Sequence, residues 1–294
     1  MRRTIDTVEV SAIGLGAMPM SIEGRPDRGR AIATIHSALD AGVTLIDTAD
    51  AYHLGATEAG SDETGHNEAL IAEALRSWGG DSQSILVGTK GGHLRTPDGN
   101  WILDGRPDHI KRAARTSASR LGLDAIGLYQ HHRPDPSVPY EDTIGALAEL
   151  IEEGVIQMAG ISNADPTQIR TANRVLDGRL ASVQNQFSPA FQTSRAELDL
   201  CAELGIAFLP WSPLGGIGRS SDLGEKFAPF VDVAYRHEVS PQRVVLAWEL
   251  SLSPTVIPIP GASRSESILD SIRAVDLSLS EDDIAYIGEH LCTE

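Results

Sequence analysis

Short apolar runs alternate with longer amphipathic stretches along the chain. The runs with the character of buried β-strands are AIGLGAM, TLIDTA, SILVGTK, AIGLYQHH, IQMAGIS, ASVQNQF, IAFLPWS and TVIPIPG. The stretches between them, such as RAIATIHSALDAG and YEDTIGALAELIEEG, space their apolar residues as amphipathic helices do. Several begin at Ser, Asp or Pro and stop at Gly, as capped helices do. About eight strand–helix units in one chain predict a (β/α)8 barrel, as a single domain over residues 1–294.

A doubly wound sheet is the competing architecture. It would be favoured by a G-x-G-x-x-G motif between a strand and a helix, but GLGAMP (Gly14 to Pro19) fails at its last position, and no Walker lysine motif is present. The barrel is therefore the better interpretation. The segment TIDTVEVSAIGL predicts a β-hairpin that caps the bottom of this barrel. The longest loops, HLGATEAGSDETGHN and GGHLRTPDGNWILDGRPD, follow strands, which predicts cofactor and substrate loops at the carboxyl-terminal face.

Charge and composition narrow the classes of partner. A net charge of −17 disfavours non-specific binding to a nucleic-acid backbone. No run approaches the roughly 20 apolar residues of a membrane span, and the first residues lack the apolar stretch of a signal peptide. The two cysteines, Cys201 and Cys292, form neither a disulfide framework nor a metal-binding spacing. We expect a cytoplasmic protein that acts on a small molecule, without an obligate protein partner.

Polar side chains stand at the carboxyl ends of the predicted strands, which meet around one mouth of a barrel. Asp47 and Tyr52 follow the second strand, Lys90 ends the third and His132 ends the fourth. An ammonium near a phenol lowers the phenol pKa from its usual value of about 10, and a carboxylate keeps that ammonium charged. A histidine can donate a hydrogen bond to the oxygen that the phenol protonates. These four types together predict a general acid directed at a carbonyl oxygen.

His131 and His132 cannot both face the barrel interior, because side chains alternate across a strand. A metal-dependent barrel hydrolase usually needs two histidines one residue apart on a strand, and the chain has none. We therefore expect no metal site. We expect the stretch GHNEALIAEAL (residues 65–75) to form a plain amphipathic surface helix, and the acidic loop before it to be a solvated excursion rather than a cover over the mouth.

Seven motifs resemble those of the aldo-keto reductases in order and spacing, from about residue 8 to about residue 285. They are GVTLIDTADAY, LVGTKGG, LYQHHRPD, GISNAD, VQNQFSP, PWSPLGG and VIPIPGASR. The resemblance implies a (β/α)8 barrel that binds NADPH and reduces aldehydes or ketones. It implies that Tyr52 is the proton donor, that Lys90 lowers its pKa and that Asp47 holds Lys90. His132, rather than His131, would orient the substrate carbonyl.

The resemblance also implies a binding site for NADP(H). Ser162, Asn163 and Gln184 would bind the nicotinamide carboxamide, and Trp211 would lie under the nicotinamide ring. The glycine-rich run SPLGGIGRS could cradle a pyrophosphate with its backbone amides; its candidate residues are Ser212, Leu214, Gly218 and Arg219.

At the other end of the cofactor, Ser263 and Arg264 precede a predicted helix and suit the 2′-phosphate of NADP. The sequence departs from the family at Ser267 and Ser271, where larger polar residues often hold the adenine.

Three functions are compatible with these residues. The leading hypothesis is an NADPH-dependent oxidoreductase that reduces aldehydes or ketones. A non-catalytic NADP(H)-binding regulatory or redox-sensor subunit is the second, and a Schiff-base lyase with Lys90 as nucleophile is the third. Met20, Trp101 and Phe191 are candidate pocket liners that would suit hydrophobic or aromatic aldehydes.

Overall fold

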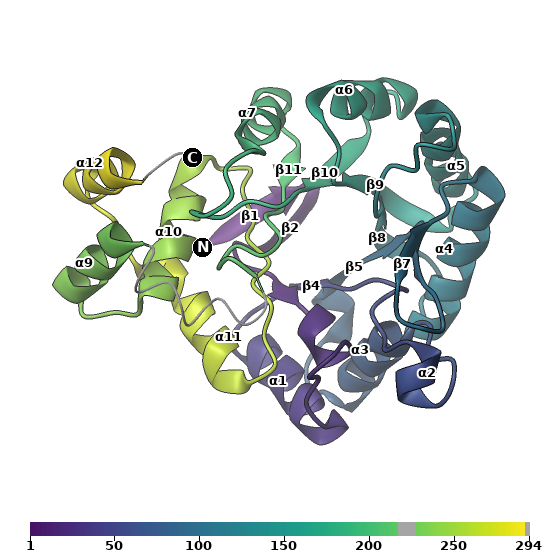
Figure 1. Ribbon diagram of the computed structural model, residues 1–294, viewed down its shortest axis with the longest axis horizontal. Coiled ribbons are helices and arrows are strands. Elements are labelled where there is room, and N and C mark those ends of the chain that lie inside the picture. Colours follow the sequence, from purple (N-terminus) through teal and green to yellow (C-terminus); the bar gives the residue numbers. More distant parts are fainter. Residues whose placement is uncertain (217–226, 292–294) are drawn as a thin grey trace.

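In the computed structural model, which describes residues 1–216 and 227–291, seven parallel strands curl into most of a barrel. Their spatial order is the reverse of their chain order, so each strand lies beside its successor in sequence. The strands form the inner ring of Figure 1. They are β3 (Leu15–Gly16), β4 (Leu45–Asp47), β5 (Leu86–Gly91), β8 (Ile126–His131), β9 (Ile156–Ser162), β10 (Leu180–Gln184) and β11 (Ala207–Phe208).

Residues 256–261 close the barrel between its two edge strands. The amide of Ile257 donates to the carbonyl oxygen of Phe208 (2.9 Å), and the amide of Gly16 donates to that of Pro260 (3.0 Å). Because Pro258 and Pro260 have no N–H group, this segment pairs through isolated parallel bridges rather than a continuous ladder. The predicted (β/α)8 barrel is confirmed, and the irregular segment 256–261 takes the place of its eighth strand.

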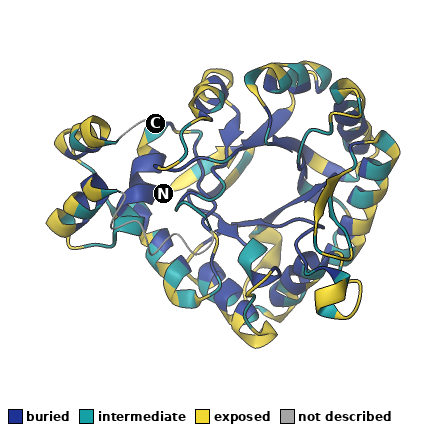
Figure 2. Ribbon diagram, in the orientation of Figure 1, coloured by how far each residue is buried: buried dark blue, intermediate teal, exposed yellow. Residues whose placement is uncertain are grey.

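Helices surround the barrel, with their buried faces inward and their exposed faces outward (Figure 2). Several start and end as the sequence predicts: Asp165 forms a capping box with Gln168, and Gly122 and Gly205 end their helices in the left-handed conformation. Within the described part of the chain, no helix is long and apolar enough to cross a membrane. The helices of the ring are α1 (Arg28–Asp40), α3 (His66–Ser77), α4 (Pro107–Leu121), α5 (Tyr140–Glu152), α6 (Pro166–Val175), α7 (Arg195–Leu204), α10 (Pro241–Leu252) and α11 (Ser265–Ile272), and α9 (Ala228–His237) and α12 (Glu281–His290) lie outside α10.

The predicted hairpin cap is also confirmed. Strands β1 (Arg2–Ile5) and β2 (Val8–Ser11) pair antiparallel. Ile5 and Val10 of this hairpin pack with Leu45 and Leu128 in the cluster that fills the barrel interior. The amide of Ser11 donates to the hydroxyl of Thr44, just before β4 begins, so the hairpin covers the amino-terminal ends of the strands. The opposite end of the barrel is left for the site.

The stretch after β5, which we expected to be a loop, contains a second hairpin. Strands β6 (His93–Arg95) and β7 (Trp101–Leu103) pair antiparallel. Arg95 forms an ion pair with Glu23 and donates to the carbonyl oxygen of His53 (2.5 Å). The hairpin is therefore fastened to the segments that follow β3 and β4.

The segment after β4 is also more ordered than a solvated loop. It contains the single-turn helix α2 (Ala56–Ala59), and the amide of Thr57 donates to the carbonyl oxygen of Pro97 (2.8 Å) in the β6–β7 hairpin.

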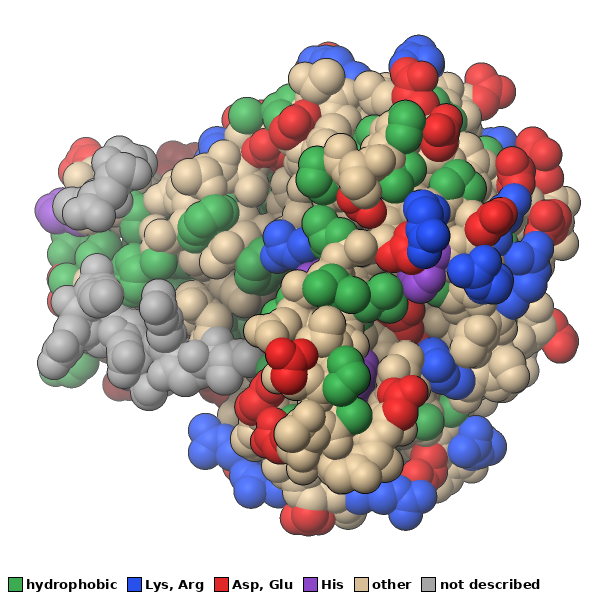
Figure 3. Space-filling model, turned by 45° about the vertical axis from the view of Figure 1, so that its right-hand side comes forward, with side chains coloured by type: hydrophobic (Ala, Val, Ile, Leu, Met, Phe, Trp, Pro, Cys, Tyr) green, Lys and Arg blue, Asp and Glu red, His purple; other side chains and the backbone are tan. Residues whose placement is uncertain are grey.

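Figure 3 shows one face of the molecule, on which hydrophobic side chains gather near the middle and acidic and basic side chains surround them.

Candidate active site

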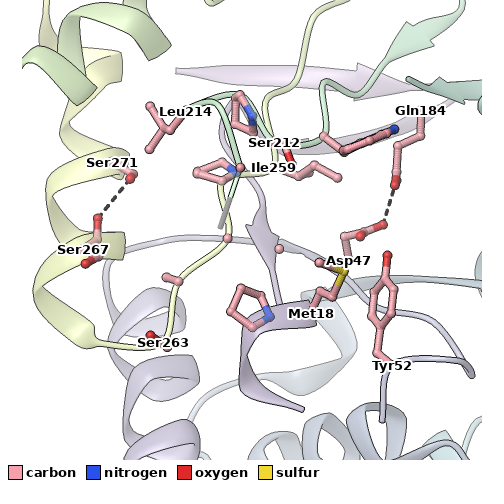
Figure 4. Close-up of a pocket in the computed structure, with 18 of the residues that line it drawn as sticks. Met18, Asp47, Tyr52, Gln184, Ser212, Leu214, Ile259, Ser263, Ser267 and Ser271 are labelled. Atoms are coloured by element: carbon pink, nitrogen blue, oxygen red, sulfur yellow. Dashed lines mark hydrogen bonds between the residues drawn. The ribbon is translucent and has the colours of Figure 1, made fainter. Parts of the chain in front are cut away.

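A cavity of about 910 Å³ opens at the carboxyl ends of the strands. Its walls come from segments that follow most of the strands, so residues far apart in sequence face one space (Figure 4). Two of the predicted cofactor residues, Gly218 and Arg219, lie outside the described residues. The predicted site residues that line the cavity are Asp47, Tyr52, His132, Ser162, Asn163, Gln184, Trp211, Ser212, Leu214, Ser263 and Arg264.

Lys90 lies just behind the cavity wall and joins the predicted acid to the predicted carboxylate. Its ammonium is fully buried and donates to Asp47 Oδ2 (2.7 Å), to the carbonyl oxygen of Thr48 (2.8 Å) and to the Tyr52 phenol oxygen (3.2 Å). All three donor protons are used, which fixes the position of the charge. The chain turns tightly after β4, where the amide of Tyr52 donates to the carbonyl oxygen of Ala49, and this turn brings the phenol back over the strand end.

Burial and the neighbouring charges set the protonation states of these groups. Burial opposes the charge on Lys90, but Asp47 and Tyr52 together more than compensate, so the pKa of Lys90 lies above its ordinary value. Burial raises the pKa of Tyr52, and the Lys90 charge partly offsets that rise. Tyr52 is thus a protonated phenol at neutral pH, and its proton lies next to a fixed positive charge.

The two adjacent histidines take opposite sides of the strand. His132 lines the cavity, and its ring meets that of Tyr52 edge to face at a centroid distance of 5.6 Å. His131 instead packs outward near Tyr140 of α5, with its centroid 6.0 Å from that of the tyrosine. Burial, followed by the charge of Lys90, holds the pKa of His132 well below its usual range. His132 is therefore a neutral imidazole that can donate one hydrogen bond into the cavity.

The residues proposed for the nicotinamide form one hydrogen-bonded wall. Gln184 donates its side-chain amide to Asp47 Oδ1 (2.8 Å), and Ser162 donates to the main-chain oxygen of Gln184 (2.7 Å). Asn163 adopts a positive φ of 57° and donates to the main-chain oxygen of His132 (3.0 Å). The indole nitrogen of Trp211 is buried and has no hydrogen-bond partner among the described residues. This wall leads from the Asp47 carboxylate to the rest of the cavity.

Backbone segments pack closely at the far end of the cavity. A Cβ atom on Gly16 would lie 2.7 Å from the main-chain oxygen of Ile259, and one on Gly261 would lie 2.9 Å from a ring carbon of Pro19, so the packing of the chain itself leaves no room for a side chain there. Beyond them, Arg264 is exposed at the N-cap of α11 and donates to the Ser267 hydroxyl (3.2 Å). The residues that line the cavity extend from Asp47 to α11, so an elongated ligand could lie along it (Figure 4).

The sequence analysis missed three residues that line the substrate end, namely His93, Arg133 and Met18. His93 stacks on Trp101 at a centroid distance of 4.6 Å and also meets His132 edge to face at 4.9 Å. Arg133, which directly follows His132, and Met18 line the cavity as well. Of the three liners suggested by sequence, Trp101 lies in the wall, whereas Met20 is buried in a core cluster and Phe191 is not among the lining residues.

A buried polar layer lies behind β4 and β5, in a helix that we expected to be a plain surface element. Glu68 and Asn67, in the first turn of α3, are completely buried. Glu68 accepts from the Thr89 hydroxyl (2.6 Å) and pairs with Arg120 (3.2 Å). Asn67 accepts from the Thr48 hydroxyl (2.6 Å). The expectation for this helix was wrong at its amino-terminal end, because these polar side chains support the strand ends that carry the site.

Over the described ranges, no three His, Cys, Asp or Glu side chains form a group that could hold a metal ion. The free thiol of Cys201 is buried, which raises its pKa to about 12, and Cys292 falls outside the described residues.

Comparison with known proteins agrees with this geometry. The model of the Aldo/keto reductase family matches residues 12–291. Pyridoxine 4-dehydrogenase from Escherichia coli is 32% identical over 95% of this chain and 94% of its own length. A thermostable aldo-keto reductase in complex with the inhibitor epalrestat superimposes with a TM-score of 0.82 at 25% identity, covering 98% of this chain and 99% of its own.

An aldo-keto reductase from Klebsiella pneumoniae, in complex with NADPH, has a TM-score of 0.78 at 24% identity, covering 98% of this chain and 95% of its own. At that identity the likeness concerns the fold alone. The family match, which spans nearly the whole chain, carries the classification: the chain belongs to the aldo/keto reductase family.

Proposed function

We propose that this oxidoreductase reduces aldehydes or ketones with NADPH, using Tyr52 as general acid. The observation that carries the proposal is the contact of one buried ammonium, that of Lys90, with both the Asp47 carboxylate and the Tyr52 phenol. A carbonyl oxygen placed in the cavity between Tyr52 and His132 would meet two neutral donors. Negative charge that develops on this oxygen during reduction is stabilised by such donors, preorganised in a site that excludes water.

Each residue of the set has one role in this proposal. Tyr52 transfers its proton to the oxygen, and Lys90 stabilises the phenolate that remains. Asp47 keeps Lys90 charged and in place. His132 donates a hydrogen bond that fixes the direction of the carbonyl. The cofactor, when bound, supplies the hydride to the carbonyl carbon.

The cavity suits NADP(H) in two respects. Its wall offers Ser162, Asn163 and Gln184, whose polar groups match the carboxamide of a nicotinamide. At the α11 end, the Arg264 guanidinium matches the 2′-phosphate of NADP. An aldo-keto reductase from Klebsiella pneumoniae that shares this fold is in complex with NADPH.

The lyase alternative requires an uncharged amine at Lys90. The ion pair with Asp47, which holds the pKa of Lys90 above its ordinary value, works against that role. The regulatory alternative requires cofactor binding without turnover, and the arrangement of an intact acid, ammonium and carboxylate favours catalysis over it.

The test is whether the protein reduces a panel of aromatic and aliphatic aldehydes. The reaction is monitored by the loss of the absorbance of the reduced nicotinamide. We expect Tyr52→Phe to lower kcat by at least about 100-fold, since general acid catalysis contributes that much. The matched control is Tyr235→Phe, because Tyr235 is 87% exposed on α9.

Three results would change the assignment. NADPH binding, measured by fluorescence, without reduction of any aldehyde would favour the regulatory alternative. Trapping of a ketone on Lys90 by borohydride would favour the lyase. No binding of either nicotinamide cofactor would refute the proposal.

A further inference from the structure

Among the described residues that line the substrate end, Arg133 is the charged one that the proposed mechanism does not use. It follows His132 directly, lines the same cavity and is half-buried. Among the residues that the structure describes, none forms an ion pair with Arg133 or accepts a hydrogen bond from it. Other half-buried arginines near the site are paired: Arg95 with Glu23, and Arg25 with Glu63.

Arg133 lines the same cavity as Tyr52, His93 and His132. Its charge lowers the pKa values of these three side chains, and it is the second cause, after burial, of the low pKa of about 4 at His93. The charge of Arg133 therefore acts on the substrate end of the cavity. Burial in turn lowers the pKa of Arg133 itself.

The other charges at this end cancel. Lys90 and Asp47 form a buried pair, whereas Tyr52, His93 and His132 are neutral at pH 7. The remaining charged liners, Arg264, Glu266 and Asp270, belong to α11 and its N-cap, at the opposite end of the cavity. Arg133 therefore gives the substrate end a net positive charge, in a chain whose formal net charge is −17.

A half-buried guanidinium without an anion has lost part of its hydration and gained nothing in return. A carboxylate or a phosphate would satisfy it through two parallel N–H···O hydrogen bonds, the arrangement that a planar guanidinium fork favours. The rings of His93 and Trp101 form the adjacent wall, so a planar spacer between the anionic group and the carbonyl would have a surface to lie against.

We propose that the preferred substrates are aldehydes or ketones that carry an anionic group, bound by Arg133 while the carbonyl oxygen lies between Tyr52 and His132. This inference rests on the proposed carbonyl reduction and specifies its substrate class. Arg133 is a specificity-determining residue in this arrangement: it holds the far end of the substrate and takes no part in the proton transfer.

The test compares pairs of related substrates of which one carries an anionic group and the other is neutral, with the protein at saturating NADPH. The carboxylate probe is para-carboxybenzaldehyde, and its neutral partner is the methyl ester of the same compound. The phosphate probe is glyceraldehyde phosphate, with glyceraldehyde as its neutral partner. For at least one pair, we expect kcat/KM for the anion to exceed that for the neutral compound by about tenfold or more, the factor expected from one charge-assisted contact. Which pair shows the preference distinguishes a carboxylate from a phosphate.

Substitution of Arg133 should remove this preference. In Arg133→Gln we expect the anion-to-neutral ratio of kcat/KM to fall to about one, and in Arg133→Lys we expect a partial ratio, because an ammonium keeps the charge but loses the fork. The control, Arg174→Gln, removes the same charge from an exposed residue of α6 that pairs with Glu141 outside the cavity. It should keep the wild-type ratio.

Ligand binding gives a second measurement that does not depend on the variants folding. Benzoate should compete with aldehyde in the wild type, and benzamide, its neutral analogue, should compete at least about tenfold more weakly. Reduction of neutral aldehydes with no preference for either anion would overturn the inference and leave the proposed function standing. A raised KM for NADPH in Arg133→Gln with an unchanged anion-to-neutral ratio would also overturn it, because Arg133 would then be a cofactor ligand.

Discussion

Glu249 is buried in the middle of α10, and its removal should stabilise the protein. The side chain is fully buried, and neither carboxyl oxygen has a hydrogen-bond partner among the described residues. Its neighbours along the helix, from Val244 to Leu250, are also buried, and they pack into two core clusters. Burial alone raises the pKa of Glu249 well above its ordinary value, so the folded protein keeps the carboxyl neutral.

Two costs follow from this placement. A buried polar group without a partner costs about 1–3 kcal/mol at any pH. The second cost depends on pH, because the unfolded chain ionises Glu249 above a pKa of about 4.3 whereas the folded chain holds its proton. The native state then binds more protons than the unfolded state, so stability is complete below the unfolded pKa and falls as the pH rises. This cost reaches at most about 3–4 kcal/mol at pH 7, since each pH unit contributes about 1.4 kcal/mol.

Glu249→Met removes both costs with a side chain of similar length. We expect a gain of about 2–5 kcal/mol at pH 7. With an unfolding entropy of about 2.1 cal/mol/K per residue over 294 residues, that gain corresponds to a rise in Tm of about 3–8 °C. At pH 4.5, close to the unfolded pKa, the pH-dependent part should shrink to about 0.6 kcal/mol, so the gain should come mainly from the pH-independent part.

The assay is the melting temperature by circular dichroism at pH 4.5 and at pH 7. Glu249→Gln separates the two costs: it cannot ionise, so it should abolish the pH-dependent part, yet its buried amide still lacks partners. The control is Glu152→Met, the same change at an exposed position of α5. An equal rise in Tm at both pH values, or no rise at all, would refute the reasoning.

Two further predictions concern the site. Lys90→Met should lower kcat, and because the Lys90 charge lowers the pKa of Tyr52, its loss should shift the rising limb of the pH–rate profile for alcohol oxidation to higher pH; a limb that stays in place would contradict the role given to Lys90. Arg264→Leu should raise the KM for NADPH by about tenfold and that for NADH much less, because the lost contact is with the 2′-phosphate. Initial rates at varied cofactor concentration measure this, and an equal rise for both cofactors would contradict it.

The strand-end residues could be predicted because the carboxyl ends of all strands in a barrel lie at the same end of it. Any residue at the carboxyl end of a strand reaches the same mouth, and alternation along β8 selects His132 over His131. The second hairpin could also have been predicted from the sequence. Its strands, His93–Arg95 and Trp101–Leu103, flank a turn of five residues that contains Pro, Asp and Gly, which is a hairpin pattern.

Other features could not be predicted because they depend on which side chains meet across the fold. The buried state of Glu68 follows from its contacts with Thr89 and Arg120, which are 21 and 52 residues away in sequence. The role inferred for Arg133 depends on the absence of a nearby carboxylate, and sequence spacing does not encode that absence. Hydrophobic periodicity predicts which face of α3 is apolar, but it does not show that the first turn of this helix lies behind β4 and β5.

The buried layer also explains how one ammonium can act on one phenol. Asp50 lies on the same turn as Tyr52, and its carboxyl group is buried among the charges of Glu68, Arg120 and Lys90. Burial, and then the negative charge of Glu68, raise the pKa of Asp50 well above its ordinary value and keep it neutral, while Arg120 balances Glu68. Lys90 therefore has Asp47 as its ionised hydrogen-bond partner, and the same ammonium reaches the Tyr52 phenol. A neutral Asp50 adds no second negative charge beside this buried group, which keeps the electrostatic effect of Lys90 on Tyr52 tied to one carboxylate.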